Sequence, residues 1–181
     1  PPKFGAIKRA NIVNDPSATN RRMSLYVVSE DDSGSLAKTG AVTKNNIKNW
    51  LKSYKSLNDV IDIHDAIIVN FRVNFLAVSD RRYDNSEVLF SCIEAIRVYF
   101  EEVKYIGEPL YLTRLYEILN RVDGVVDIKN VTVKGISGGL YSRTSLKFSN
   151  ILSRDGTYYK VPRNVILELK YPSLDIKGTV K

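Results

Sequence analysis

The chain has 181 residues, of which 44% are hydrophobic and 26% are charged, and its formal net charge is +7. These values predict one folded domain with room for an appendage and exclude a wholly disordered chain. With one cysteine and one histidine, an internal disulfide and a Cys/His or multi-histidine zinc site are excluded. No apolar run approaches the ~18 residues of a membrane span and no signal-peptide pattern opens the sequence, so we expect no membrane partner. Because the sequence begins at Pro1 without an initiator methionine, we expect a fragment of a longer protein.

The positive charge lies at the two ends of the chain. Residues 1–22 carry a net charge of +4 and residues 140–181 carry +5, whereas residues 23–139 carry −2. Basic flanks on a nearly neutral core fit a subunit that docks on neighbouring chains, where charge guides association. The alternative is that these charges only keep the protein soluble.

The N-terminal third predicts two strands and a helix. The strands are Phe4–Val13 and Met23–Glu30, which we expect to pair as a hairpin with a long loop. Thr43 is the expected helix cap, and Trp50 is expected in the core. The apolar face of this helix comprises Ile47, Trp50, Leu51, Tyr54 and Leu57.

A lysine stripe follows a second face of the same helix, formed by Lys44, Lys48, Lys52 and Lys55. It is either a face that binds phosphate groups or an acidic partner, or a solvated outer face, and we favour the solvated face.

The middle of the chain predicts a strand followed by two helices. The strand, Ala66–Val78, directs Ile67, Val69, Phe71, Val73 and Phe75 to one side and Asn70, Arg72 and Asn74 to the other. Asp84 and Glu87 form a capping box for the next helix, and Cys92 within its apolar face predicts a small buried hydrophobe rather than a reactive thiol. The other residues of that face are Leu89, Ile93, Ile96, Tyr99, Phe100 and Val103.

The third helix and the following strand carry their own boundary signals. The helix begins near Pro109, presents Leu112, Leu115, Ile118, Leu119 and Val122 on one face, and ends at Gly124 in a left-handed conformation. The strand Val125–Lys134 has a break in its alternation that predicts a bulge near Asn130. Gly135, Gly138 and Gly139 then predict a flexible break.

The C-terminal part predicts only short strands, with a tight hairpin at Asp155-Gly156. They are Ser145–Ile151, Thr157–Val161, Val165–Tyr171 and Leu174–Val180. Because such short strands bury little by themselves, we expect them to dock on the main domain or on a partner.

Together these elements predict an α+β fold: a mixed β-sheet with about three helices packed on it, plus a C-terminal antiparallel β meander. We expect three parts: a basic N-terminal β extension over residues 1–22, an α+β core domain over residues 23–136, and a C-terminal β-rich segment over residues 137–181.

The sequence offers little for catalysis. His64 stands between Asp62 and Asp65, but no nucleophile with a supporting motif accompanies it, so we expect a surface or strand-edge histidine rather than a general base. The segment Gly135–Gly139 lacks the spacing of a phosphate-binding loop. We therefore assign no catalytic, cofactor-binding or metal-binding residue and expect a protein that is not an enzyme. The eleven tyrosines fit a protein that binds other polypeptides, although strand propensity explains any single one.

Several short sequence segments of the chain resemble a known family. They are Tyr26–Asp31 followed by Ser33-Gly34, the helix end Asn49–Leu57, the acidic turn Asp62–Ala66 leading into Ile67–Phe71, Val122–Val125, and the ending Asp175–Lys181. In their order, they resemble the C-terminal part of the baseplate J-like family, the baseplate wedge proteins of contractile-tailed, T4-type bacteriophages.

The resemblance implies a structural virion protein of the tail baseplate. Such a protein forms a homodimer, links neighbouring wedges into a ring around the tail hub, and contacts other wedge, hub and sheath-proximal proteins. Its expected location is the virion, and the host cytoplasm during assembly, and it needs no cofactor. The alternative is a basic nucleic-acid-binding accessory domain that uses the lysine stripe; an enzyme that uses His64 is a third alternative.

Overall fold

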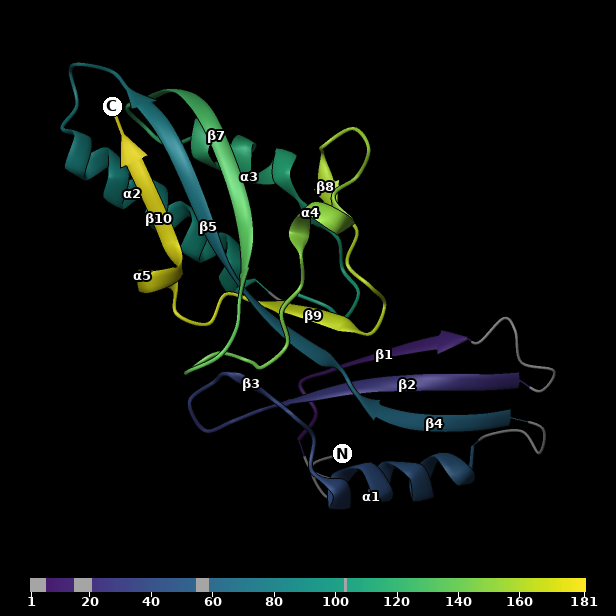
Figure 1. Cartoon of the computed structure of the whole chain (residues 1–181). Coiled ribbons are helices and arrows are strands. Elements are labelled where there is room, and N and C mark those ends of the chain that lie inside the picture. The colour runs from purple at the N-terminus through teal and green to yellow at the C-terminus, as the bar shows by residue number, and fades with distance from the viewer. Residues whose placement is uncertain (1–5, 15–20, 55–58, 103) are drawn as a thin grey trace. The chain divides into compact units, whose positions relative to one another are not determined.

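The structure is a computed structural model that describes residues 6–14, 21–54, 59–102 and 104–181 (Figure 1). Its helices and its mixed parallel and antiparallel strands confirm the α+β prediction. The chain divides into two compact units. Unit 1 comprises residues 1–68, 105–107 and 162–166, and unit 2 comprises residues 69–104, 108–161 and 167–181. This interleaved division differs from the expected boundaries after residues 22 and 136, because strands from distant parts of the chain pair with one another.

Unit 1 is built around the strand β2 (Arg21–Glu30). The strand β1 (Arg9–Asn14) pairs with it antiparallel, which confirms the expected hairpin; the loop at residues 15–20 lies outside the described part. The strand β4 (Asp59–Asp65) pairs with β2 in parallel, and β3 (Leu36–Ala37) pairs with its end. The expectation of a turn at Asp62–Ala66 is therefore wrong for Asp62–Asp65, which belong to β4 because they pair in parallel with β2. Only Ala66 lies outside the strand.

The core of unit 1 joins segments that are far apart in the sequence. Val28, Ala66, Ile106 and Ile166 are buried together. The side-chain amide of Asn11 donates to the carbonyl oxygens of Ile106 at 3.2 Å and Arg163 at 3.0 Å. The short segments 105–107 and 162–166 are thus each fixed to the sheet of unit 1 by apolar packing and by a hydrogen bond.

The helix of unit 1, α1, spans Ala41–Lys52. Its N-cap is Gly40, with no side-chain cap, so the prediction of Thr43 as the cap is wrong. Thr43 is half-buried within the first turn, where it is already part of the helix. The expected helix positions Lys55 and Leu57 lie outside the described residues.

Unit 2 contains a second sheet in the order β10-β5-β7, with β9 also paired to β5. The strands are β5 (Ile67–Ser79), β7 (Val125–Ile136), β9 (Val165–Glu168) and β10 (Ile176–Val180). Between β5 and β7 the register skips Lys129, which confirms a bulge next to Asn130. On β5, Val69, Phe71, Val73 and Phe75 are buried as predicted, but Ile67 is 37% exposed, contrary to prediction.

The expected C-terminal antiparallel meander is wrong, although the expected docking on the main domain is confirmed. β10 pairs with β5 in parallel, and β8 (Tyr158–Tyr159) pairs with β6 (Leu110–Tyr111). The segment expected as the strand Ser145–Ile151 instead contains the short helix α4 (Phe148–Ile151). Strands this short gain more by completing an existing sheet than by pairing with each other.

Two long helices pack on the second sheet. α2 (Asn85–Glu101) begins at Asp84, whose carboxylate accepts the amides of Ser86 and Glu87, and it packs over β10. α3 (Leu112–Asn120) packs on β7 and is followed by Gly124 with a φ of +84°. Its start lies after β6 rather than at Pro109, because Leu110 and Tyr111 pair with β8. A further short helix, α5 (Pro172–Asp175), leads into β10.

The expected flexible break begins later than Gly135. This residue lies in β7, and a Cβ atom there would stand 2.7 Å from the carbonyl oxygen of Leu146, so the position requires close backbone approach. Gly138 and Gly139 do form a turn, with positive φ angles. Over the described ranges, the helices are too short or too polar to cross a membrane.

Candidate functional site

The outer surface of α1 is the feature of unit 1 that most resembles a binding surface. Every residue of this helix is described, and none is fully buried. The helix contacts β4 along one side, where Ile47 and Leu51 are half-buried. A twelve-residue helix that buries so little contributes little to the hydrophobic core.

Large apolar side chains are exposed on α1 and just after it. Trp50 is 42% exposed, Tyr54 is 70% exposed and Val42 is 74% exposed. The rings of Trp50 and Tyr54 stand 4.6 Å apart between centroids, tilted by 42°. The prediction that Trp50 anchors the core is wrong, because nearly half of the side chain is exposed.

Two exposed lysines lie on a different side of α1 from Trp50, since residues two apart on a helix do not face each other. Lys48 and Lys52 are exposed, and with Leu51 and Ile61 they line a groove of about 50 Å³. The groove therefore has an apolar floor and ammonium groups at its rim. We call the surface formed by Trp50 and Tyr54 the α1 outer face.

The lysine stripe is only partly a solvated face. Lys44 is 25% exposed, and its ammonium forms an ion pair with Asp65 at 2.9 Å, so it binds α1 to β4. Lys48 and Lys52 are exposed, as the solvated interpretation predicts. Lys55 lies outside the described residues. The exposed part of the described stripe therefore consists of Lys48 and Lys52, one turn apart.

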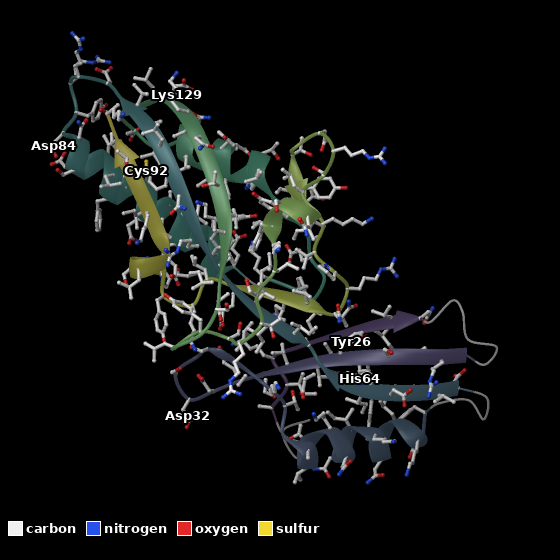
Figure 2. All side chains as sticks on the ribbon, viewed as in Figure 1. Tyr26, Asp32, His64, Asp84, Cys92 and Lys129 are labelled. Carbon is white, nitrogen blue, oxygen red and sulfur yellow. The ribbon has the colours of Figure 1, made fainter. Side chains whose placement is uncertain are left out.

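His64 lies on the exposed surface of β4, which confirms the expected position. It stands beside Tyr26 of the neighbouring strand, with 5.7 Å between ring centroids (Figure 2). In the described ranges, no three or more His, Cys, Asp or Glu side chains gather as metal ligands would.

Cys92 is buried in α2, as predicted (Figure 2). Burial raises the pKa of its thiol to about 11. The neutral thiol is therefore the dominant form at neutral pH, which disfavours nucleophilic chemistry.

A buried polar cluster in unit 2 has no counterpart among the sequence predictions. The side-chain amide of Asn70 donates to Glu168 Oε2 at 2.7 Å, and its carbonyl accepts the amide of Ser142 at 2.7 Å. The buried Asp175 accepts the hydroxyl of Tyr141 at 2.8 Å. Burial and this contact raise the pKa of Tyr141. These bonds fix the loop after β7 against the sheet, so the cluster has a structural role.

The tyrosines divide between interior and surface. Tyr159 is buried and Tyr141 is bonded to Asp175, whereas the tyrosines with the largest exposed fractions are Tyr54, Tyr83, Tyr105 and Tyr111. Of these, Tyr54 also has an exposed tryptophan beside it, and Trp and Tyr are the residues most enriched at protein interfaces.

The α1 outer face therefore presents two exposed aromatic side chains in contact, a composition that suits a polypeptide partner. The sequence signal for it was the apolar stripe that contains Trp50 and Tyr54, but Trp50 was expected in the core. In the comparisons with known proteins, neither a protein family nor a curated protein matches this chain.

Proposed function

We propose that this chain is a structural protein of a phage tail baseplate, which works by binding other polypeptides, and that the α1 outer face is one of its docking surfaces. The observation that carries the proposal is the 42% exposure of Trp50 beside the exposed Tyr54. A paired tryptophan and tyrosine on a helix with no buried residue is costly to leave in water, and a partner that covers the pair recovers that free energy.

The identity of the assembly follows from the resemblance of residues 25–133 to the baseplate J-like family. On this proposal the chain forms a dimer, links neighbouring wedges into a ring around the tail hub and contacts hub and sheath-proximal proteins. It would reside in the virion after assembly in the host cytoplasm. The net charge of +7 supports docking on acidic neighbours.

Sedimentation velocity with purified baseplate wedge and hub proteins tests the proposal. The wild-type chain is expected to co-sediment with at least one of them, and Trp50→Ala is expected to weaken that complex by tenfold or more, as loss of an interface tryptophan does. Tyr111→Ala is the matched control, because Tyr111 is 47% exposed and pairs with Tyr158 at 5.5 Å in unit 2. Equal affinity of all three chains, or no complex at all, would reject the proposal.

A second candidate function, nucleic-acid binding, is favoured by one observation: Lys48 and Lys52 are exposed one turn apart on α1, where both ammonium groups can contact phosphates. Phosphate contacts predict that log K falls with log salt at a slope of roughly −0.9 per contact on duplex DNA. Replacing both lysines, Lys48→Gln and Lys52→Gln, is expected to flatten that slope. Absence of DNA binding at low salt would eliminate this candidate.

A further inference from the structure

The strand β10 forms one edge of the sheet in unit 2. It runs parallel to β5, with Ile176 in register with Val73 and Val180 in register with Ala77. Figure 1 shows it beside β5, on the side away from β7. Among the strands of the described ranges, only β5 pairs with it.

The hydrogen bonds of Lys181 determine which backbone groups of β10 face outward. The amide of Lys181 donates to Ala77 O at 3.1 Å, and its carbonyl accepts the amide of Ser79 at 3.0 Å. In a parallel ladder, alternate residues bond to the same neighbour with both groups. Lys177 and Thr179 therefore bond to β5, whereas Gly178 and Val180 direct their N–H and C=O groups to the open edge.

At the opposite edge of this sheet, formed by β7, a side chain bonds an outward-facing amide. By the same alternation, the amide of Val131 in β7 points away from β5, and it donates to the hydroxyl of Tyr116 at 3.0 Å. A side chain thus occupies this edge amide, which is one way in which proteins protect an edge strand from pairing. At β10, Gly178 and Val180 are half-buried, and among the described residues no hydrogen bond occupies their outward groups.

The two sides of β10 have different chemistry. On the α2 side, Ile176 is buried, and the hydrogen of Gly178 points at Phe75 and Leu89, so this side is apolar. On the other side, Lys177 is exposed, and β7 contributes the exposed Lys134 to the same face. Arg72 of β5 also lies on this face, but it is half-buried near Tyr141, which bonds the buried Asp175. The acidic Asp127 of the same face is paired with Lys129. The exposed charges that this side offers to an incoming strand are therefore the lysines Lys177 and Lys134.

We propose that the outer edge of β10 is a docking site for an extended acidic segment of another polypeptide, which adds a strand to the sheet. Four backbone groups of Gly178 and Val180 supply the hydrogen bonds. Acidic side chains at alternate positions of the incoming strand face Lys177, and apolar ones face the α2 side. A second copy of β10 fits less well, because pairing would place its lysines on the same face as Lys177 and repulsion would oppose association.

This site goes beyond the α1 outer face, since it lies in the other unit and uses backbone groups rather than aromatic side chains. The proposals for the α1 outer face and for the edge of β10 can therefore be tested independently. Trp50→Ala is expected to leave strand addition at β10 unchanged, so loss of binding at one surface does not decide the other.

Amide hydrogen exchange on the full chain gives the first test. The probe is a short, end-blocked peptide in which glutamate and valine alternate, and a peptide in which lysine and valine alternate is the control. The acidic peptide is expected to slow exchange at Gly178 and Val180 by tenfold or more while leaving Lys177 and Thr179, already bonded to β5, nearly unchanged. Absence of protection at Gly178 and Val180, or equal protection by the basic peptide, would overturn the proposal. Protection that grows with protein concentration without peptide would identify a second copy as the occupant and would also overturn it.

A matched pair of variants tests the backbone requirement. Val180→Pro removes an outward N–H and no bond to β5, whereas Val180→Ala keeps that N–H. Loss of one net hydrogen bond is expected to weaken peptide binding by about tenfold in the proline variant relative to the alanine variant. Lys177→Glu is expected to weaken it by several-fold, with a smaller effect at high salt. If Val180→Pro does not fold, the exchange pattern of the wild-type chain and the peptide affinity of Lys177→Glu still test strand addition at β10. Unchanged affinity in the folded variants would contradict strand addition.

Discussion

The ammonium of Lys44 lies 2.9 Å from Asp65 Oδ2, and the second carboxylate oxygen of Asp65 accepts the amide of Thr39 at 3.1 Å. One carboxylate at the end of β4 thus holds both the first turn of α1 and the segment that leads into it. This contact holds the N-terminal end of α1 beside β4. Trp50, near the C-terminal end of α1, and Tyr54, just after the helix, are exposed.

Removing the charge of Asp65 should loosen α1 without unfolding the protein. Asp65→Asn is expected to lower the free energy of unfolding by about 1 kcal/mol, since a partly buried charged hydrogen bond is weakened. It should also speed hydrogen exchange of the α1 amides. Asp62→Asn is the control, because its partner Arg22 is 57% exposed and the pair does not involve α1. Equal effects of the two substitutions on α1 would contradict the role assigned to Asp65.

Trp50→Ala should change stability little. Because Trp50 is 42% exposed, we expect a loss of less than about 1 kcal/mol in the free energy of unfolding. A tryptophan in the core would cost ~3–5 kcal/mol, and Phe71→Ala, at a residue with 1% exposure, provides that reference. Denaturant unfolding of the two variants measures the difference. A loss at Trp50 as large as that at Phe71 would show that α1 is packed more deeply than described.

The case of Trp50 shows what periodicity cannot determine. The spacing of Ile47, Trp50, Leu51 and Tyr54 correctly predicts a helix with one apolar stripe, but a stripe is wider than the part that one edge of a small sheet can cover. Which part is buried depends on the pairing of β4 with β2, and β4 was not predicted. The exposed aromatic pair, and with it the candidate site, therefore could not be located from the sequence.

Gly178 should tolerate no side chain without a shift of its neighbours. A Cβ atom there would stand 2.2 Å from Phe75 Cζ and 2.6 Å from Leu89 Cδ1. Gly178→Ala is expected to cost about 1–3 kcal/mol through overpacking, and Phe75→Leu in the same chain should recover part of that loss. A double-mutant cycle of unfolding free energies measures the coupling. Strict additivity of the two substitutions would contradict the packing of β10 under α2.

The C-terminal strands illustrate the second limit of the sequence. The strand that contains Ile176–Val180 was predicted, but its partner was not, because a short alternating segment carries no signal for parallel or antiparallel pairing. The longer elements were predicted best: β5 and α2 have enough residues for their periodicities of two and 3.6 to be distinguished. The cap at Asp84 and the left-handed Gly124 were also predicted, since local chemistry alone determines them.

The buried thiol of Cys92 should make stability depend on pH in the alkaline range. Burial raises its pKa from 9.0 to about 11, so the unfolded chain loses this proton first as the pH rises. The stability that the neutral thiol contributes is complete below pH 9 and is lost progressively towards pH 11. Unfolding curves for wild type and Cys92→Ala across this range measure the effect. The free energy of unfolding of the wild type should fall more steeply between pH 9 and pH 11 than that of Cys92→Ala. An identical decline in both proteins would contradict it.

The most direct measurement of whether the chain works by binding other polypeptides is photo-crosslinking from position 50 in the native assembly, with p-benzoylphenylalanine in place of Trp50. We predict a crosslink to a second polypeptide of the tail baseplate, and a weaker or different pattern from position 111, which lies in unit 2. Crosslinks within the same chain only, or to nucleic acid only, would contradict the proposed function.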